Sequence, residues 1–313
     1  MKNKFLSLCA SVLLLFFILG WSARPSWAGM PDAIDDFSYY LPLVANNQPV
    51  PPQQWIVVDH RHTDIHQIPP AWIEQARKYL VHYAHTSHGS QVLTGLEWLK
   101  SRDAIAYNVD IHVGGLVEMP DDDKGLRIYD GNNYAGTHYI TPDMYWESTD
   151  GMNHTRQVAN TGWFHFSLWT WCGQMSDPGT AVQTYLDVLA QFENQYPSMR
   201  FIYYTGHTDG NPPGSALLTN NETVRQYVQN NQKVLFDFAD IESYDPAGTF
   251  YSMASDSCGW CNTWCSAHPL NFECLDLPAS DSECAHTHGL QCTLKGQAFW
   301  WLMARLAGWN GTP

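Results

Sequence analysis

The sequence predicts an α/β protein in which about five parallel strands form one doubly wound sheet between two layers of helices. Short apolar segments of strand length alternate along the chain with longer segments whose apolar residues recur at helical spacing. Hydrophobic residues make up 44% of the 313 residues and aromatic residues 14%, which is enough for a large core. Charged residues make up only 15%, so the composition excludes a disordered chain and a coiled coil.

Five segments have the length and apolar character of buried strands, and four have the periodicity of helices. The predicted strands are 79–84, 109–113, 164–171, 201–205 and 234–238, and the predicted helices are 90–102, 180–195, 220–231 and 295–306. In the first helix, Val92, Leu96 and Leu99 fall on one face, and Pro197 ends the second helix. Strands that alternate with helices form βαβ units, which predicts a parallel sheet.

The N-terminus has the pattern of an export signal. Two lysines precede an apolar run over 5–19, and Ser26 and Ala28 are small residues at the −3 and −1 positions of a cleavage site. The alternative is a membrane anchor, but the run of about 15 residues is shorter than the ~20 that span a bilayer. We therefore expect a signal peptide over 1–28, a proline-rich linker over 29–53, and a secreted or periplasmic protein.

The charge balance is acidic. Asp and Glu number 31 against 16 Lys and Arg, which gives a formal net charge of −15. Such a surface repels phosphate backbones and anionic lipids, so nucleic acid and membrane surfaces are excluded as partners. After the signal peptide, no segment is long and apolar enough for stable membrane insertion.

Six of the eight cysteines crowd into the segment 256–293, within a domain that we expect over 54–313. They are Cys258, Cys261, Cys265, Cys274, Cys284 and Cys292. In an exported protein this crowding predicts a disulfide-rich C-terminal loop, and six cysteines allow 15 pairings. The alternative is a zinc knuckle built from the first three. Cys172 stands apart, and we expect it to be a buried free thiol.

Polar residues follow each predicted strand and precede the last helix. In doubly wound sheets, ligands bind beyond the carboxyl ends of the strands. The residues at these positions are, in chain order, His85, Ser87 and Gly89; Gly114 and Gly115; Gln174; His207 and Asp209; Asp237, Asp240 and Glu242; and, before the last helix, Asp281, Glu283, His286 and His288.

In this order, the segments resemble the SGNH (GDSL-type) hydrolase superfamily over roughly 79–309. The turn His85-x-Ser87-x-Gly89 is similar to a poorly characterised bacterial group with His-x-Ser-x-Gly in place of Gly-Asp-Ser. The resemblance implies a flavodoxin-like, three-layer sandwich and an ester hydrolase without a cofactor. It implies Ser87 as the nucleophile and Glu283-x-x-His286 as the acid–histidine segment, with Asp281 and His288 as the alternative acid and base.

The same resemblance implies the groups around the substrate. Gly114 or Gly115 and Gln174 would hold the oxyanion with the Ser87 N–H, although Gln174 stands where the superfamily has Asn. His85, His207 and Asp209 would surround the substrate. The reaction class is acyl transfer to water, by an esterase or deacetylase, and the substrate is a small-molecule or glycan ester, such as an acylated carbohydrate.

Two other functions remain open from the sequence. A metalloprotein is suggested by the 14 histidines, which cluster at His60-x-His62 with His66 and at His82, His85 and His88; His112, His207 and His288, with Asp209 or Asp240, are further candidate ligands. A non-catalytic carbohydrate-binding module is suggested by the missing Gly-Asp-Ser. Ser87 can also be read as a cap of the helix 90–102. Asn153, Asn221 and Asn310 begin glycosylation sequons.

Overall fold

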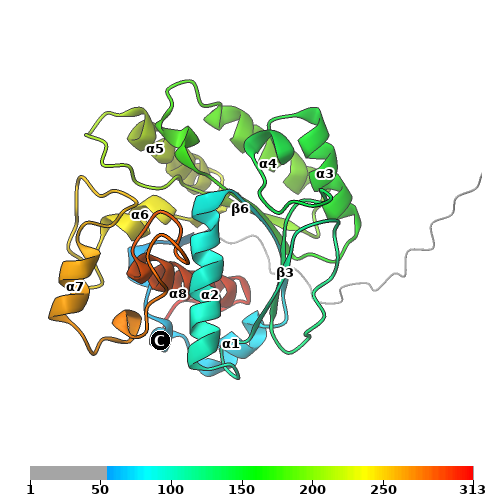
Figure 1. Ribbon diagram of the computed structural model, residues 1–313. Coiled ribbons are helices and arrows are strands. Elements are labelled where there is room, and N and C mark those ends of the chain that lie inside the picture. The colour runs from blue at the N-terminus through cyan, green and yellow to red at the C-terminus, as the bar shows by residue number, and fades with distance from the viewer. Residues whose placement is uncertain (1–54, 313) are drawn as a thin grey trace, which may run out of the picture. The chain divides into compact units, whose positions relative to one another are not determined.

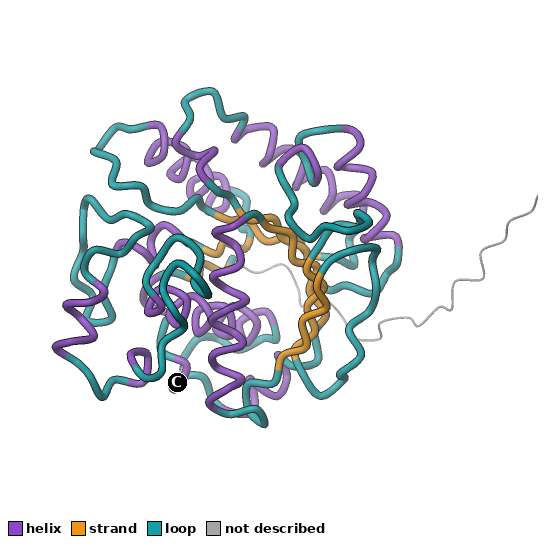
Figure 2. The backbone as a smooth tube through the Cα atoms, viewed as in Figure 1, coloured by secondary structure: helices purple, strands orange, loops and turns teal. Residues whose placement is uncertain are grey.

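The computed structural model describes residues 55–312. The predicted signal peptide and linker lie outside the described residues. The described chain forms one sheet whose paired strands are all parallel, with helices on both of its faces (Figures 1 and 2). The predicted α/β class is therefore confirmed.

The sheet has seven strands rather than the five that the sequence predicted. They are β1 (Ile56–Val58), β2 (Leu80–His85), β3 (Val109–Val113), β4 (Leu126–Asp130), β5 (Phe166–Thr170), β6 (Arg200–Tyr204) and β7 (Val234–Phe236), in the order β1-β7-β6-β5-β2-β4-β3. The two strands missed, β1 and β4, lack a clear strand pattern. The first has three residues, and the second interrupts its apolar residues with a charge at Arg127 and follows an acidic loop.

The five inner strands run β4-β2-β5-β6-β7. Counted along the chain from β2, this order is 2-1-3-4-5, one of the two common orders of doubly wound sheets. β2 therefore lies between β4 and β5, at the point where the strand order reverses. Ligand sites of such sheets lie beyond the carboxyl ends of the strands at this point.

Eight helices accompany the sheet within residues 55–312. They are α1 (Pro70–Ala76), α2 (Ser90–Arg102), α3 (Thr149–Asn160), α4 (Val182–Gln195), α5 (Ala216–Asn230), α6 (Phe238–Ser243), α7 (Cys261–Ala267) and α8 (Gly289–Leu306). Figure 1 shows α1, α2 and α8 on one face of the sheet and α3, α4 and α5 on the other. The four predicted helices are all present, and the last begins six residues earlier than predicted.

The last helix, α8, is the centre of one helical layer. Every residue of this helix except Arg305 is buried. It crosses α2 where Gly95 faces Gly296, and a Cβ added at Gly296 would lie 2.3 Å from the backbone carbonyl carbon of Gly95. The two helices approach this closely because neither residue has a side chain, and Gly95 lies among the buried residues of α2.

Replacing Gly296 with Ala is expected to lower the free energy of unfolding by about 1–3 kcal/mol, because the added methyl group forces two backbones apart. Urea denaturation measures this change. Gly259→Ala is the matched control, since a Cβ there meets no atom within 4 Å and its effect is expected within about 0.5 kcal/mol. Equal stability of the two variants would contradict the close packing of α2 and α8.

The six clustered cysteines form three disulfides, and each disulfide joins two cysteines with no other cysteine between them in the sequence. The bonds are Cys258–Cys261, Cys265–Cys274 and Cys284–Cys292. The prediction of a disulfide-rich loop is confirmed, and no sulfur of this loop is left for a zinc knuckle. Disulfides form in oxidising compartments, which agrees with an exported protein. Cys172 is free as predicted, but it is half-buried rather than buried.

Candidate functional site

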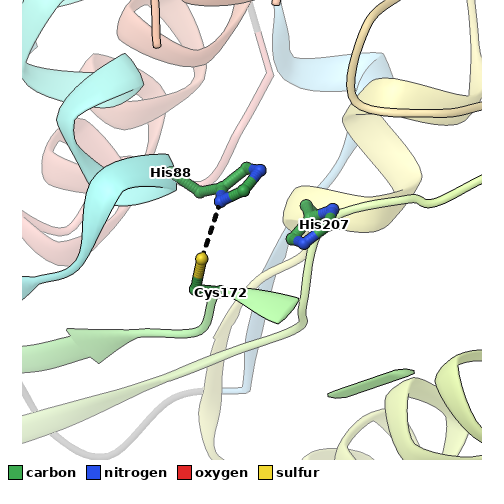
Figure 3. Close-up of side chains that lie close together, drawn as sticks. All are labelled: His88, Cys172 and His207. Carbon is green, nitrogen blue, oxygen red and sulfur yellow. Dashed lines mark hydrogen bonds between the residues drawn. The ribbon is translucent and has the colours of Figure 1, made fainter. Parts of the chain in front are cut away.

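The carboxyl ends of three adjacent strands bring a thiol and two imidazoles together (Figure 3). His85 at the end of β2 pairs in register with Thr170 at the end of β5. Ser87 and Cys172 each follow two residues later, and the next strand, β6, is followed by His207. The parallel register of the sheet therefore places these groups side by side.

Cys172, His88 and Asp256 form a chain of hydrogen bonds. Nδ1 of His88 lies 3.0 Å from Sγ of Cys172, and Nε2 of the same ring lies 3.2 Å from Oδ2 of Asp256. Oγ of Ser87 lies 3.5 Å from the same sulfur. This is the order of groups that a nucleophile, its base and an orienting acid require.

Local structure fixes the sulfur and the imidazole. Cys172 follows the buried strand β5, and its backbone N–H donates to Oε1 of Gln174 at 2.8 Å. His88 lies in the tight turn between β2 and α2, where the next residue is Gly89. A Cβ there would lie 2.2 Å from Oγ1 of Thr170, so only glycine lets this turn pack against the end of β5.

The pKa values of the pair favour a thiolate beside an imidazolium. Burial alone would raise the pKa of the Cys172 thiol, but the hydrogen bond and charge of His88, with contacts from Ser87 and the Gly173 N–H, lower it from 9.0 to about 6. Burial would lower the pKa of His88, whereas its hydrogen bonds to Asp256 and Cys172 raise it from 6.5 to about 9. At neutral pH the sulfur is therefore charged, and a thiolate is the nucleophilic form of cysteine.

Two further imidazoles stack on the ring of His88. The ring of His207 lies parallel to it, with centroids 3.8 Å apart and planes 1° apart. The ring of His286 stacks at 4.6 Å and 18°. The ring of His88 is thus stacked against two imidazoles and hydrogen-bonded at both nitrogens.

The same cluster offers ligand atoms to a metal ion. One ligand atom each from His88, Cys172 and His207 lies within 4.8 Å of the others, and sulfur with imidazole nitrogen suits zinc or copper. The stacking opposes this use, because an imidazole binds a metal through a lone pair in its ring plane. An ion in the plane of one ring would lie roughly 3.5 Å outside the plane of the other. Binding through both rings requires His207 to rotate out of the stack.

The structure separates most of the predicted acid–histidine segment from Ser87. His286 reaches the site through its ring contact with His88, but Glu283 is exposed and its carboxylate accepts the Ala279 N–H at 2.8 Å. Asp281 is also exposed. His288 caps α8, where Nδ1 accepts the Leu290 N–H at 3.2 Å, and Nε2 lies 3.1 Å from Asn262.

The glycines expected at the oxyanion lie at the edge of the sheet. Gly114 and Gly115 follow β3, which β4 separates from β2. The Gly114 N–H already donates to the carbonyl of Asp130 at 2.7 Å. Of the other predicted substrate-binding residues, His85 is buried 2.9 Å from an Asp130 oxygen, and Asp209 is exposed and accepts from Ser176. The catalytic and binding roles assigned from the resemblance stay predictions.

The histidines of the first cluster suggested as metal ligands each contact an aspartate. His60 contacts Asp240 at 2.5 Å, His62 contacts Asp59, and His66 contacts Asp64. Ligand atoms of Asp59, His60 and Asp240 also lie within 4.8 Å of one another, so this group could hold a metal ion. His82 is fully buried inside the sheet, where burial outweighs its hydrogen bonds and lowers its pKa from 6.5 to about 3.

One of the three sequons is inaccessible in the folded chain. Asn221 is buried in α5, where its side-chain oxygen accepts the Gly206 N–H at 2.8 Å. Asn153 and Asn310 are exposed. Ser87 does not cap α2, because Gly89 occupies the N-cap position and no side chain caps this helix.

The sequence did not identify Cys172 as part of the site, although it follows the third predicted strand directly. Its place at a strand end was the available signal. Asp256 offered no signal, because it belongs to the disulfide-rich segment and meets His88 across 168 residues.

Comparisons with protein-family models, with curated proteins and with solved structures found no match to this chain. Among the helices of residues 55–312, none combines the length and the apolar character that crossing a membrane requires. The function must therefore be inferred from the site itself.

The rate of alkylation of Cys172 by iodoacetamide is expected to rise with pH through about 6, well below the ordinary thiol value, because only the thiolate reacts. His88→Asn removes the charge that stabilises the thiolate, so the rate at pH 7 should fall by roughly ten- to a hundredfold. Mass spectrometry of the labelled protein across the pH range measures both. Cys172→Ser is the blank. A wild-type midpoint above pH 8 would contradict the ion pair.

Proposed function

We propose that this protein is an exported thiol hydrolase that cleaves esters by acyl transfer through Cys172. The observation that carries the proposal is the hydrogen-bond chain from Cys172 through His88 to Asp256. The reaction class is the one that the SGNH resemblance implied, with a sulfur nucleophile in place of the Ser87 hydroxyl. The hydrogen-bond partner of Ser87 Oγ is the sulfur of Cys172 and not a histidine, which favours cysteine.

In the first half of the reaction, the thiolate of Cys172 attacks the carbonyl carbon of the ester and a C–S bond forms. The tetrahedral intermediate then collapses, the C–O bond to the alcohol breaks, and His88 gives its Nδ1 proton to the departing oxygen. The products are the free alcohol, a thioester on Cys172 and a neutral His88. Asp256 keeps the imidazole in the orientation that this transfer needs.

In the second half, neutral His88 takes a proton from a water molecule whose oxygen attacks the thioester carbonyl. The C–S bond breaks, the carboxylic acid leaves, and the thiolate and imidazolium are restored. We expect the amide of Gln174 to assist, because its oxygen accepts the Cys172 N–H and its NH₂ group remains as a hydrogen-bond donor.

A cavity of about 240 Å³ adjoins the segment that follows His207, although none of Cys172, His88 and Asp256 lines it. Thr208, the residue after His207, lines it, and so do the aromatic rings of Tyr244, Phe250 and Tyr251. Pockets with mostly apolar walls and a few polar groups are typical of small-molecule sites. A small-molecule or glycan ester is the substrate class that we propose, and the acylated carbohydrate implied by the resemblance is one member of it.

Hydrolysis of p-nitrophenyl acetate tests the proposal. Cys172→Ala is expected to lower kcat/KM by roughly a thousandfold or more, because it removes the nucleophile. Ser87→Ala, the matched control at the neighbouring hydroxyl, should cost less than about tenfold, and a chelator should have no effect. Loss of activity in Ser87→Ala with activity retained in Cys172→Ala would overturn the proposal and restore the serine nucleophile.

A metal-binding function is the second candidate, because His88, Cys172 and His207 place their ligand atoms within 4.8 Å of one another. Measurement of bound zinc by mass spectrometry distinguishes the two. If the cluster binds metal, His207→Ala should abolish zinc binding, and a chelator should remove activity. If the cluster is a thiol nucleophile, neither zinc nor chelator should matter.

A further inference from the structure

A buried ammonium group lies beneath the site and belongs to none of the groups that react. Lys295 is on α8 and is fully buried. Its Nζ donates to Oε1 of Gln91 and to Oε1 of Glu242, the latter at 2.6 Å, and it lies 3.8 Å from the ring centre of Phe238. Both Lys295 and Glu242 have side chains with 0% exposure, so this ion pair is withdrawn from water.

One branch of the hydrogen-bond network around this ammonium group runs through Glu242 to two neighbours of His88, namely His207 and Asp256. The second oxygen of Glu242 accepts the N–H and the hydroxyl of Thr208, at 2.6 and 2.9 Å. The carbonyl of Thr208 lies 2.7 Å from Nδ1 of His207 and accepts the backbone N–H of Asp256 at 3.0 Å. Through one threonine, Glu242 therefore fixes both the stacked imidazole and the orienting acid.

The other branch leads to the third neighbour. The amide of Gln91 uses its oxygen to accept from Lys295, and its NH₂ group donates to the carbonyl of Ala285 at 2.6 Å. The next residue is His286, whose ring stacks on His88. His286 is exposed and has a positive φ of 64°, so its place depends on how the backbone before it is held.

We propose that Lys295 is the positioning residue of this site, because its ammonium group ties together the segments that carry His207, Asp256 and His286. A buried ion pair contributes little net stability, since desolvation offsets the attraction. What it supplies is geometry, because both partners must keep their hydrogen bonds to remain buried. The inference rests on the proposed function, since it assigns a role at the same site.

The test removes the Lys295–Glu242 ion pair and measures the pH dependence of alkylation of the Cys172 thiol. The double variant Lys295→Met/Glu242→Gln leaves no unpaired buried charge, and near-UV circular dichroism verifies its fold. Because the charge of Glu242 itself helps to raise the pKa of His88, Gln91→Met, which keeps this charge, is measured beside it. The midpoint of iodoacetamide alkylation is expected to rise by at least one pH unit, which makes the reaction at pH 6 at least about fivefold slower. A merely structural pair would lower the melting temperature without moving this midpoint.

A second ion pair supplies the matched control. Lys233 and Glu193 contact each other at 2.5 Å with side chains 17% and 15% exposed, and neither lies at the carboxyl ends of β2, β5 and β6. Lys233→Met/Glu193→Gln is expected to leave the alkylation midpoint unchanged. An equal shift in both double variants would overturn the proposal.

If the Lys295→Met/Glu242→Gln protein does not fold, a milder variant provides the test. Gln91→Met keeps the side-chain volume and removes both the bond from Lys295 and the bond to Ala285, but it leaves the bonds of Glu242 to Lys295 and Thr208 in place, so a smaller upward shift of the midpoint is expected. An unchanged midpoint in a folded Lys295→Met/Glu242→Gln protein, or in folded Gln91→Met if the double variant does not fold, would overturn the positioning role. The two proposals fail separately. A shifted midpoint without ester turnover refutes the hydrolase alone, and Cys172-dependent turnover with an unshifted midpoint refutes the positioning role alone.

Discussion

The proposed chemistry depends on a single imidazole that is engaged at both nitrogens. His88 meets the sulfur of Cys172 with one nitrogen and a carboxylate of Asp256 with the other. A half-buried thiol surrounded by apolar residues would hold its proton and be inert. The adjacent imidazolium reverses this, and the acid behind it keeps the imidazolium charged in spite of burial. Removing His88 therefore raises the pKa values of both Cys172 and Asp256.

This arrangement is assembled from two parts of the fold with different physical origins. The sheet supplies Cys172 and His88, whose separation follows from the register of β2 and β5. The disulfide-rich segment supplies Asp256 and His286, which have no strand beneath them. That segment is held by three short disulfide loops and by side chains of α2, including Gln91. The oxidised state of these six cysteines is therefore part of how the site is built.

Sequence periodicity predicted the parts of the fold that repeat locally. The helix over 90–102 and the strand over 109–113 coincide with α2 and β3, because their apolar residues follow one clear period. β4 was missed, since a five-residue strand with Arg127 and a terminal aspartate has no such pattern. That omission matters for the site, because β4 separates the predicted oxyanion glycines from β2.

The sequence by itself determined the α/β class, the export pattern, the disulfide-rich loop, and the end of the sheet that carries polar chemistry. Each depends on composition or on residues close together in the chain. Only the tertiary structure decided which groups meet: that Ser87 faces a sulfur, that His88 rather than His286 contacts it, and that Asp256 lies behind His88. Such pairings depend on strand order, register and loop closure, which act between residues as far as 168 positions apart and leave no periodic trace in the sequence.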